Sequence, residues 1–101
     1  MVGSFEVIAE PNRRRILELL GNSERPVGDL VGHLKVSQPA VSKHLRILRE
    51  AGLVEARSIG QRRLYRLRSE PLREMYAWLH QYRRLWESHL DKLDKHLDTM
   101  P

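Results

Sequence analysis

The polar and basic side chains of residues 37–46 have the chemistry needed to contact base edges and phosphates. Glutamine can pair with adenine, serine with several base edges, and lysine with guanine or phosphate. If Val41, Leu45 and Leu48 face a core at helical spacing, then Ser42, Lys43 and Arg46 point outward. A solvated amphipathic helix is the alternative interpretation. The contacts with double-stranded DNA that this spacing predicts are Gln38, Pro39, Ser42, Lys43 and Arg46.

A second basic cluster surrounds a predicted turn at Gly60. Guanidinium groups gathered on one small hairpin repel each other unless an anion is near, and a phosphate backbone or a narrow minor groove provides one. The alternative is an edge hairpin that charge protects from aggregation. The predicted contacts in this cluster are Arg57, Gln61, Arg62 and Arg63, with Arg66 close by. Residues 13–15 are three further arginines, which suit either phosphate contact or simple solvation.

The residue sets of common enzymes and thiolate metal sites are missing from this sequence. It contains 0 cysteines, which excludes disulfides, thiolate ligands and a cysteine nucleophile. No Ser/His/Asp set, glycine-rich phosphate loop or carboxylate pair occurs at usable spacing, so we predict no catalytic residues and no enzyme activity. His80 and His89 would lie on opposite sides of one helix and could not chelate together within a chain. We therefore predict no metal site and no cofactor.

The length and charge of the chain favour a single basic domain. Its 101 residues suit one domain spanning 1–101, and its formal net charge is +5. A basic balance favours an anionic partner such as nucleic acid, although a basic surface kept for solubility is equally compatible with it. Neither a signal-peptide run nor an apolar stretch near the ~20 residues that span a bilayer is present. We expect a cytoplasmic protein without a membrane partner.

Hydrophobic spacing predicts four helices, a β-hairpin and a last helix. Ser4 is the expected N-cap of the first helix, and Ser37 that of the fourth. The expected element ranges are 4–9, 11–20, 27–34 and 38–51 for the helices, 53–57 and 63–67 for the strands, and 72–97 for the last helix. Gly21-Asn22 and Gly52 are the expected helix ends, because both residue types tolerate the left-handed conformation. This mainly α order with a small β-hairpin is typical of a winged helix-turn-helix.

Apolar residues of the last predicted helix form one stripe with steps of three and four. A helix this long cannot bury both faces against a domain this small, and an exposed aromatic stripe marks a partner surface. A second copy, related by a two-fold axis, is the simplest partner, and packing within one chain is the alternative. The predicted interface residues on this helix are Leu72, Met75, Leu79, Tyr82, Trp86, Leu90 and Leu93.

Three stretches of the chain resemble the ArsR/SmtB family of bacterial repressors. They are E-P-N-R-R-R-I-L-E-L-L at 10–20, V-S-Q-P-A-V-S-K-H-L-R-I-L-R-E-A-G-L at 36–53, and G-Q-R-R-L-Y-R-L at 60–67. The resemblance implies a homodimer whose first and last helices, 4–9 and 72–97, form the interface, which adds Phe5. It also implies binding to an inverted repeat that overlaps a promoter. Its implied DNA contacts are Ser37, Gln38, Ser42, Lys43, His44, Arg62 and Arg63.

Departures from the family pattern concern its metal sites. The family motif E-L-C-x-C-D-L is matched here by V-G-D-L-V-G-H at 27–33, without cysteine. Asp94-Lys95-His96 matches only the first half of the other common site, Asp-x-His with a later histidine pair. Residues 78–86 are similar to a subgroup without metal sites, often encoded beside a small lipid-binding-fold protein. We predict a dimeric repressor without metal regulation and leave its inducer open. The alternatives are a metal-responsive repressor and a protein–protein adaptor that uses the surface around Trp78 and Trp86.

Overall fold

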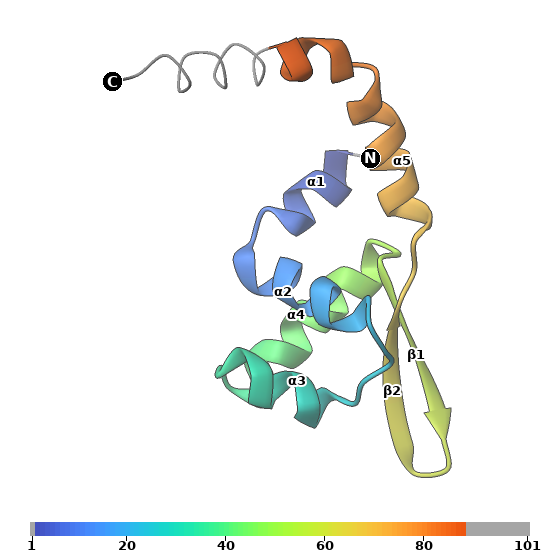
Figure 1. Ribbon diagram of the computed structural model, residues 1–101. Helices are drawn as coiled ribbons and strands as arrows, with labels where there is room; N and C mark the ends of the chain where they lie inside the picture. The colour runs from blue at the N-terminus through green and yellow to red at the C-terminus, as the bar shows by residue number, and fades with distance from the viewer. Residues whose placement is uncertain (1, 89–101) are drawn as a thin grey trace.

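The computed structural model describes residues 2–88 and has the predicted order of elements (Figure 1). The helices are α1 (Val2–Ile8), α2 (Pro11–Leu20), α3 (Val27–Leu34), α4 (Gln38–Glu50) and α5 (Glu70–His80), and the strands are β1 (Val54–Ile59) and β2 (Arg62–Leu67). The two strands pair antiparallel as one hairpin between α4 and α5. The mainly α winged helix-turn-helix prediction is confirmed. In Figure 1, α1 and α5 lie at the upper end and the hairpin tip at the lower end.

One hydrophobic core holds α2, α3, α4 and the start of β1 together. The apolar periodicity of α2 and α4 turns their leucines, isoleucine and valine inward, as predicted. Side chains from one face of α3 pack against this core, among them Val27, Val31 and Leu34. The core therefore fixes which face of α4 stays in solvent. Its buried members are Ile16, Leu17, Leu19, Leu20, Leu30, Val41, Leu45, Leu48, Leu53 and Val54.

Local signals set both ends of α4 as predicted. The Ser37 hydroxyl accepts a hydrogen bond from the Ala40 N–H at 3.3 Å, and Pro39 fits the first turn because its missing N–H is not needed there. Gly52 follows the helix with a φ of +76°. The turn before α4 uses Lys35 with a φ of +57°, a left-handed conformation that ends α3 sharply.

Three boundaries differ from the prediction. Ser4 lies inside α1, which begins at Val2, so it is not the N-cap. Gly21 has a φ of −64°, a right-handed conformation, and its N–H continues the helical pattern to the Leu17 carbonyl at 2.9 Å. Strand pairing extends to the Ile59–Arg62 pair, so the turn holds only Gly60 and Gln61. The hairpin is thus longer and tighter than its sequence pattern indicates.

The prediction of one continuous helix over 72–97 is wrong at residues 81–82. There α5 gives way to a turn, and residues 83–88 are helical again. The Gln81 side-chain amide donates to the Trp78 carbonyl at 2.9 Å, an acceptor that the Tyr82 N–H would use in a regular helix. Tyr82 N–H donates instead to the Leu79 carbonyl at 3.0 Å. A side chain inserted into the hydrogen-bond ladder is a known cause of helix bends. Residues 89–97 of the prediction lie outside the described residues.

Candidate nucleic-acid interface

The outer face of α4 is polar and basic. Val41, Leu45 and Leu48 on the inner face are at most 1% exposed, which places Ser42, Lys43 and Arg46 in solvent. Ser42, Lys43 and Arg46 line a shallow hollow together with Pro39. Ser37 and Gln38 are also exposed, at the start of the helix. The structure thus brings the predicted contacts of α4 together on one surface, with His44 as the exception.

Antiparallel pairing positions the predicted contacts of the hairpin, the wing of this fold. Burial falls along both strands toward the turn, so the tip projects beyond the core. Gln61, Arg62 and Arg63 are exposed at this tip. The Arg63 guanidinium lies 5.5 Å from the centre of the Tyr65 ring, which fits a cation–π contact. The tip therefore presents two arginines side by side in sequence but on opposite faces of the hairpin.

Arg25 attaches the wing to the helical body. Its backbone exchanges two hydrogen bonds with Tyr65 of β2, at 3.0 and 2.9 Å. Its side chain donates to the Leu19 carbonyl at 3.1 Å and to an Asp29 carboxylate oxygen at 2.6 Å. This hydrogen bond lowers the pKa of Asp29, with the positive charge of the guanidinium acting in the same direction. In the sequence, Arg25 precedes Pro26 and indicates only a break between two helices, so this connection was not predicted.

Ion pairs within the chain divide the basic residues into two groups. Arg57 is engaged by Glu24, with 2.9 Å between Nη2 and Oε2, and Arg66 pairs with Glu55 and Glu24. Lys43, Arg46, Arg62 and Arg63 make no ion pair with another residue of the described range 2–88. Among the predicted DNA contacts, those on α4 and at the wing tip therefore keep a positive charge that is available to an external anion.

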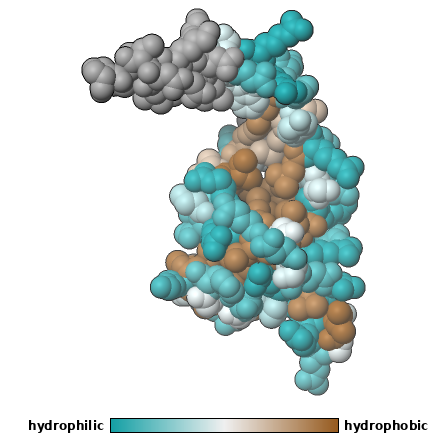
Figure 2. Space-filling model, viewed as in Figure 1, coloured by the Kyte–Doolittle hydropathy of each residue, from teal (hydrophilic) through white to brown (hydrophobic). Residues whose placement is uncertain are grey.

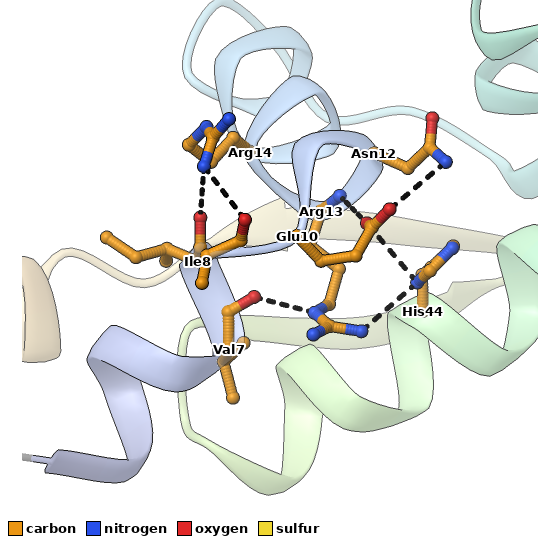
Figure 3. Close-up of polar contacts among 8 residues, drawn as sticks. Val7, Ile8, Glu10, Asn12, Arg13, Arg14 and His44 are labelled. Atoms are coloured by element: carbon orange, nitrogen blue, oxygen red, sulfur yellow. Dashed lines mark hydrogen bonds and ion pairs between the residues drawn. The ribbon is translucent and has the colours of Figure 1, made fainter.

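His44 points from α4 toward Glu10 and Arg13 (Figure 3). Its side chain is only 17% exposed, and Nδ1 lies 3.8 Å from a Glu10 carboxylate oxygen. The same nitrogen lies 3.4 Å from Nη1 of Arg13. This position joins α4 to the junction of α1 and α2 and leaves no room for a base contact from His44. We do not carry His44 into the proposed DNA contacts.

Two of the three clustered arginines end α1 (Figure 3). Arg13 donates from Nε to the Val7 carbonyl at 2.6 Å, and Arg14 donates to the Ile8 and Ala9 carbonyls at 2.9 and 3.1 Å. These carbonyls belong to the last turn of a helix, where no intrahelical partner exists. Arg15 pairs with Glu18 at 3.0 Å instead. These hydrogen bonds to backbone carbonyls are a role for Arg13 and Arg14 that the sequence did not predict.

The predicted interface residues divide into exposed and buried sets. Tyr82 and Trp86 are each 45% exposed, and Phe5 of α1 meets Trp78 at a ring-centre distance of 5.5 Å. Leu79 is half-buried, Leu72 packs against the core, and Met75 is only 4% exposed. Leu90 and Leu93 lie outside the described residues. Tyr76, Trp78 and Leu85 are exposed large apolar side chains that the prediction did not include.

Two further features concern membranes and metals. Within residues 2–88, no helix is long and apolar enough to cross a membrane. The same part of the chain contains no group of three histidine, cysteine, aspartate or glutamate side chains placed to hold a metal ion. Asp94 and His96, which match half of a family metal motif, lie outside the described residues.

Residues 10–56, which include all of α2, α3 and α4, match the sequence model of the bacterial regulatory protein, arsR family. The transcriptional repressor SdpR of Bacillus subtilis is 35% identical over 75 residues, which cover 74% of this chain and 83% of that protein. This chain belongs to the ArsR family. The ArsR family consists of DNA-binding transcriptional regulators and not of enzymes, so its partner is double-stranded DNA.

Other members of the ArsR family cover this chain as well. The structure of an ArsR-like transcriptional regulator from a Rhodococcus species is 27% identical, with a TM-score of 0.77 over 99% of this chain and 92% of that one. The transcriptional activator HlyU of Vibrio cholerae is 38% identical over 76 residues, which cover 75% of this chain and 70% of that protein. Relatives of this ArsR-family chain therefore include both repressors and an activator.

Proposed function

We propose that this chain is a homodimeric repressor that binds an inverted-repeat operator and is not regulated by a metal ion. The observation that carries the proposal is that four of the predicted DNA contacts, Lys43, Arg46, Arg62 and Arg63, are exposed and make no ion pair within residues 2–88. Lys43 and Arg46 lie on the outer face of α4, and Arg62 and Arg63 lie at the wing tip. A helix fits the major groove, which is about 12 Å wide, and a hairpin tip fits the narrower minor groove.

Within this proposal α4 reads sequence and the wing contributes affinity. Gln38 and Lys43 are suited to adenine and guanine edges, and Ser42 to several bases. The start of α4, capped by Ser37, favours a phosphate because its free N–H groups point outward. Arg62 and Arg63 contact the backbone or the walls of the minor groove. Arg57 is left out, because Glu24 already neutralises it.

The exposed apolar side chains of residues 76–86, most of them aromatic, support the proposal of a dimer. Tyr76, Trp78, Tyr82, Leu85 and Trp86 are each at least 43% exposed in a single chain, and α5 lies at the end opposite the wing tip. A surface of this kind is rarely left in water. Two copies joined here would present two α4 helices to successive major grooves, with half-site centres about 34 Å apart. Repression then follows from excluding polymerase at the operator.

Selection from random DNA duplexes at physiological salt tests the proposal, once with a metal chelator and once with added Zn²⁺ or Ni²⁺. An enriched inverted repeat whose half-sites are about one helical turn apart would support it. A single half-site would contradict the dimer, and loss of enrichment when Zn²⁺ or Ni²⁺ is added would contradict the absence of metal regulation. Failure to enrich any sequence in a folded sample would overturn the proposal and favour a protein–protein adaptor.

Removing one wing charge should weaken binding to every sequence alike. Arg62→Ala is expected to reduce the slope of log K against log salt by about 1, since one phosphate contact releases about one counterion. Mobility-shift titrations on operator and on random DNA at several salt concentrations measure this slope. Arg73→Ala, an exposed arginine of α5, is the control that should keep the slope. An unchanged slope for Arg62→Ala would remove this residue from the contacts.

A charge placed in the aromatic surface should separate the dimer. Trp86→Lys is expected to shift the dimer to monomer by at least 10-fold in dissociation constant, because a desolvated ammonium without a partner is costly at an interface. Sedimentation at micromolar protein concentration measures the change. Trp86→Phe keeps an aromatic ring and should remain dimeric. A Trp86→Lys variant that sediments as the wild type does would contradict this interface.

A further inference from the structure

Ile59 is an exposed apolar side chain that belongs neither to the proposed DNA contacts nor to the apolar surface of residues 76–86. It is 51% exposed at the end of β1, whereas every other exposed large apolar side chain in residues 2–88 falls within 76–86. Figure 2 shows a hydrophobic area on the hairpin, separate from that near α5. A single exposed isoleucine is common on protein surfaces. Its position at the tip of a basic wing gives it a specific chemical setting.

The strand register places Ile59 beside the Arg62 guanidinium, which makes no ion pair within residues 2–88. Ile59 pairs directly with Arg62, and residues directly opposite in an antiparallel pair share a face. Gly60, with a φ of +62°, closes the two-residue turn between them. Arg63 belongs to the opposite face, where it lies over Tyr65. One face of the tip thus carries a branched apolar side chain next to a cation.

We propose that Ile59 enters the minor groove beside Arg62 and packs against a deformable base step, making it a specificity determinant of this wing. The inference rests on the proposed function, since it assumes an operator under the wing. Apolar side chains in the minor groove contact or partly unstack base steps, and pyrimidine–purine steps such as TA yield most easily. Arg62 supplies attraction to the phosphates, and Ile59 supplies the preference for a flexible step. The wing then reads sequence without a hydrogen bond to a base.

Charge selects DNA over a second copy as the occupant of this tip. Two wing tips in contact would bring the guanidiniums of Arg62 and Arg63 against like charges, which is unfavourable. A minor groove offers the opposite sign, and its potential is strongest where it is narrow. The same arginines that keep tips apart therefore bring Ile59 to the groove wall.

Two operators that differ only under the wing test the inference. One operator carries a TA step at the position under the wing, and the other carries a stiff base step at that position. The rest of the operator sequence is the same in both. The wild type is expected to prefer the TA operator about 5-fold, which matches the loss of one buried aliphatic contact. Ile59→Ser should lose this preference and keep the salt slope, because it changes no charge. Ile59→Val should retain most of it, and Arg62→Ala should weaken binding to both operators.

Fluorescence anisotropy on both operators measures these affinities, and thermal melting checks that the variants remain folded. If Ile59→Ser keeps the full preference for TA, the inference is overturned while operator binding, and with it the proposed function, stands. A wild type without any preference between the two operators overturns it as well. If the preceding selection enriches no operator, both proposals fall together.

Discussion

Charge reversal at Lys43 (Lys43→Glu) is expected to lower operator affinity at least 100-fold and to leave the fold intact. Lys43 is exposed at the middle of the outer face of α4, beside Ser42 and Arg46. The substitution removes an attraction to DNA and adds a carboxylate that faces phosphates, and like charges at an interface cost several kcal/mol. A 100-fold loss corresponds to about 2.7 kcal/mol. Because the side chain has no ion pair within residues 2–88, folding should not depend on it.

Two further variants separate a local effect from a change in net charge. Arg73→Glu makes the same charge change in the first turns of α5, where a carboxylate favours the helix dipole. Screening over about 8 Å at physiological salt should limit its effect on affinity to about twofold. Lys43→Ala should cost about 10-fold and relax base preference at one position of each half-site. Equal affinities of Lys43→Glu and Arg73→Glu would show that α4 does not read the DNA.

Truncation of Leu45 (Leu45→Ala) is expected to destabilise the fold by about 3 kcal/mol. Leu45 is 1% exposed and lies in the core at the middle of α4, between the inward side chains of Val41 and Leu48. Leucine-to-alanine substitutions at such sites cost roughly 2–5 kcal/mol, because the lost contacts leave a cavity. For a domain of about 100 residues, this corresponds to a fall in melting temperature of roughly 12–20 °C. Thermal melting followed by circular dichroism measures the change.

The matched control for this truncation is Ile59→Ala, which removes a similar side chain from an exposed position. Its effect on stability should stay within about 0.5 kcal/mol. Both variants need the same protomer concentration, since a dimer gains apparent stability with concentration. If the Leu45→Ala variant has the same melting temperature as the Ile59→Ala variant, then α4 is not held by the core described above.

The sequence was most informative where function and folding use local signals. Ser37 and Gly52 act through their own backbone neighbourhood, so the ends of α4 were predictable from residue type. The spacing of Val41, Leu45 and Leu48 then determined which side chains of α4 face solvent. Gly60 likewise indicated the hairpin turn, although the pairing of the strands reached two residues further into the tip than the pattern suggested.

Side chains that bind distant backbone groups could not be predicted in this way. Arg25 reaches Leu19 and Tyr65, and Arg13 reaches Val7 and His44, only because the fold brings these groups together. The DNA contact predicted for His44 came from the family resemblance, whereas the fold places this side chain beside Glu10 and Arg13. The turn after α5 has no glycine or proline to announce it, since Gln81 causes it through its side chain.

The internal engagement of Arg13, Arg14 and Arg57 bears on how this regulator finds one site in a genome. The chain has 18 lysines and arginines, yet the proposed interface relies on few of them. Each additional phosphate contact strengthens binding to every sequence, and it therefore lengthens the residence time of the protein at nonspecific sites. A genome offers about a million or more competing sites, so short residence times at these sites reduce the time needed to find the operator. By directing arginines to its own carbonyl and carboxyl groups, the protein keeps its hold on random DNA weak and leaves discrimination to the proposed contacts of α4 and of Ile59.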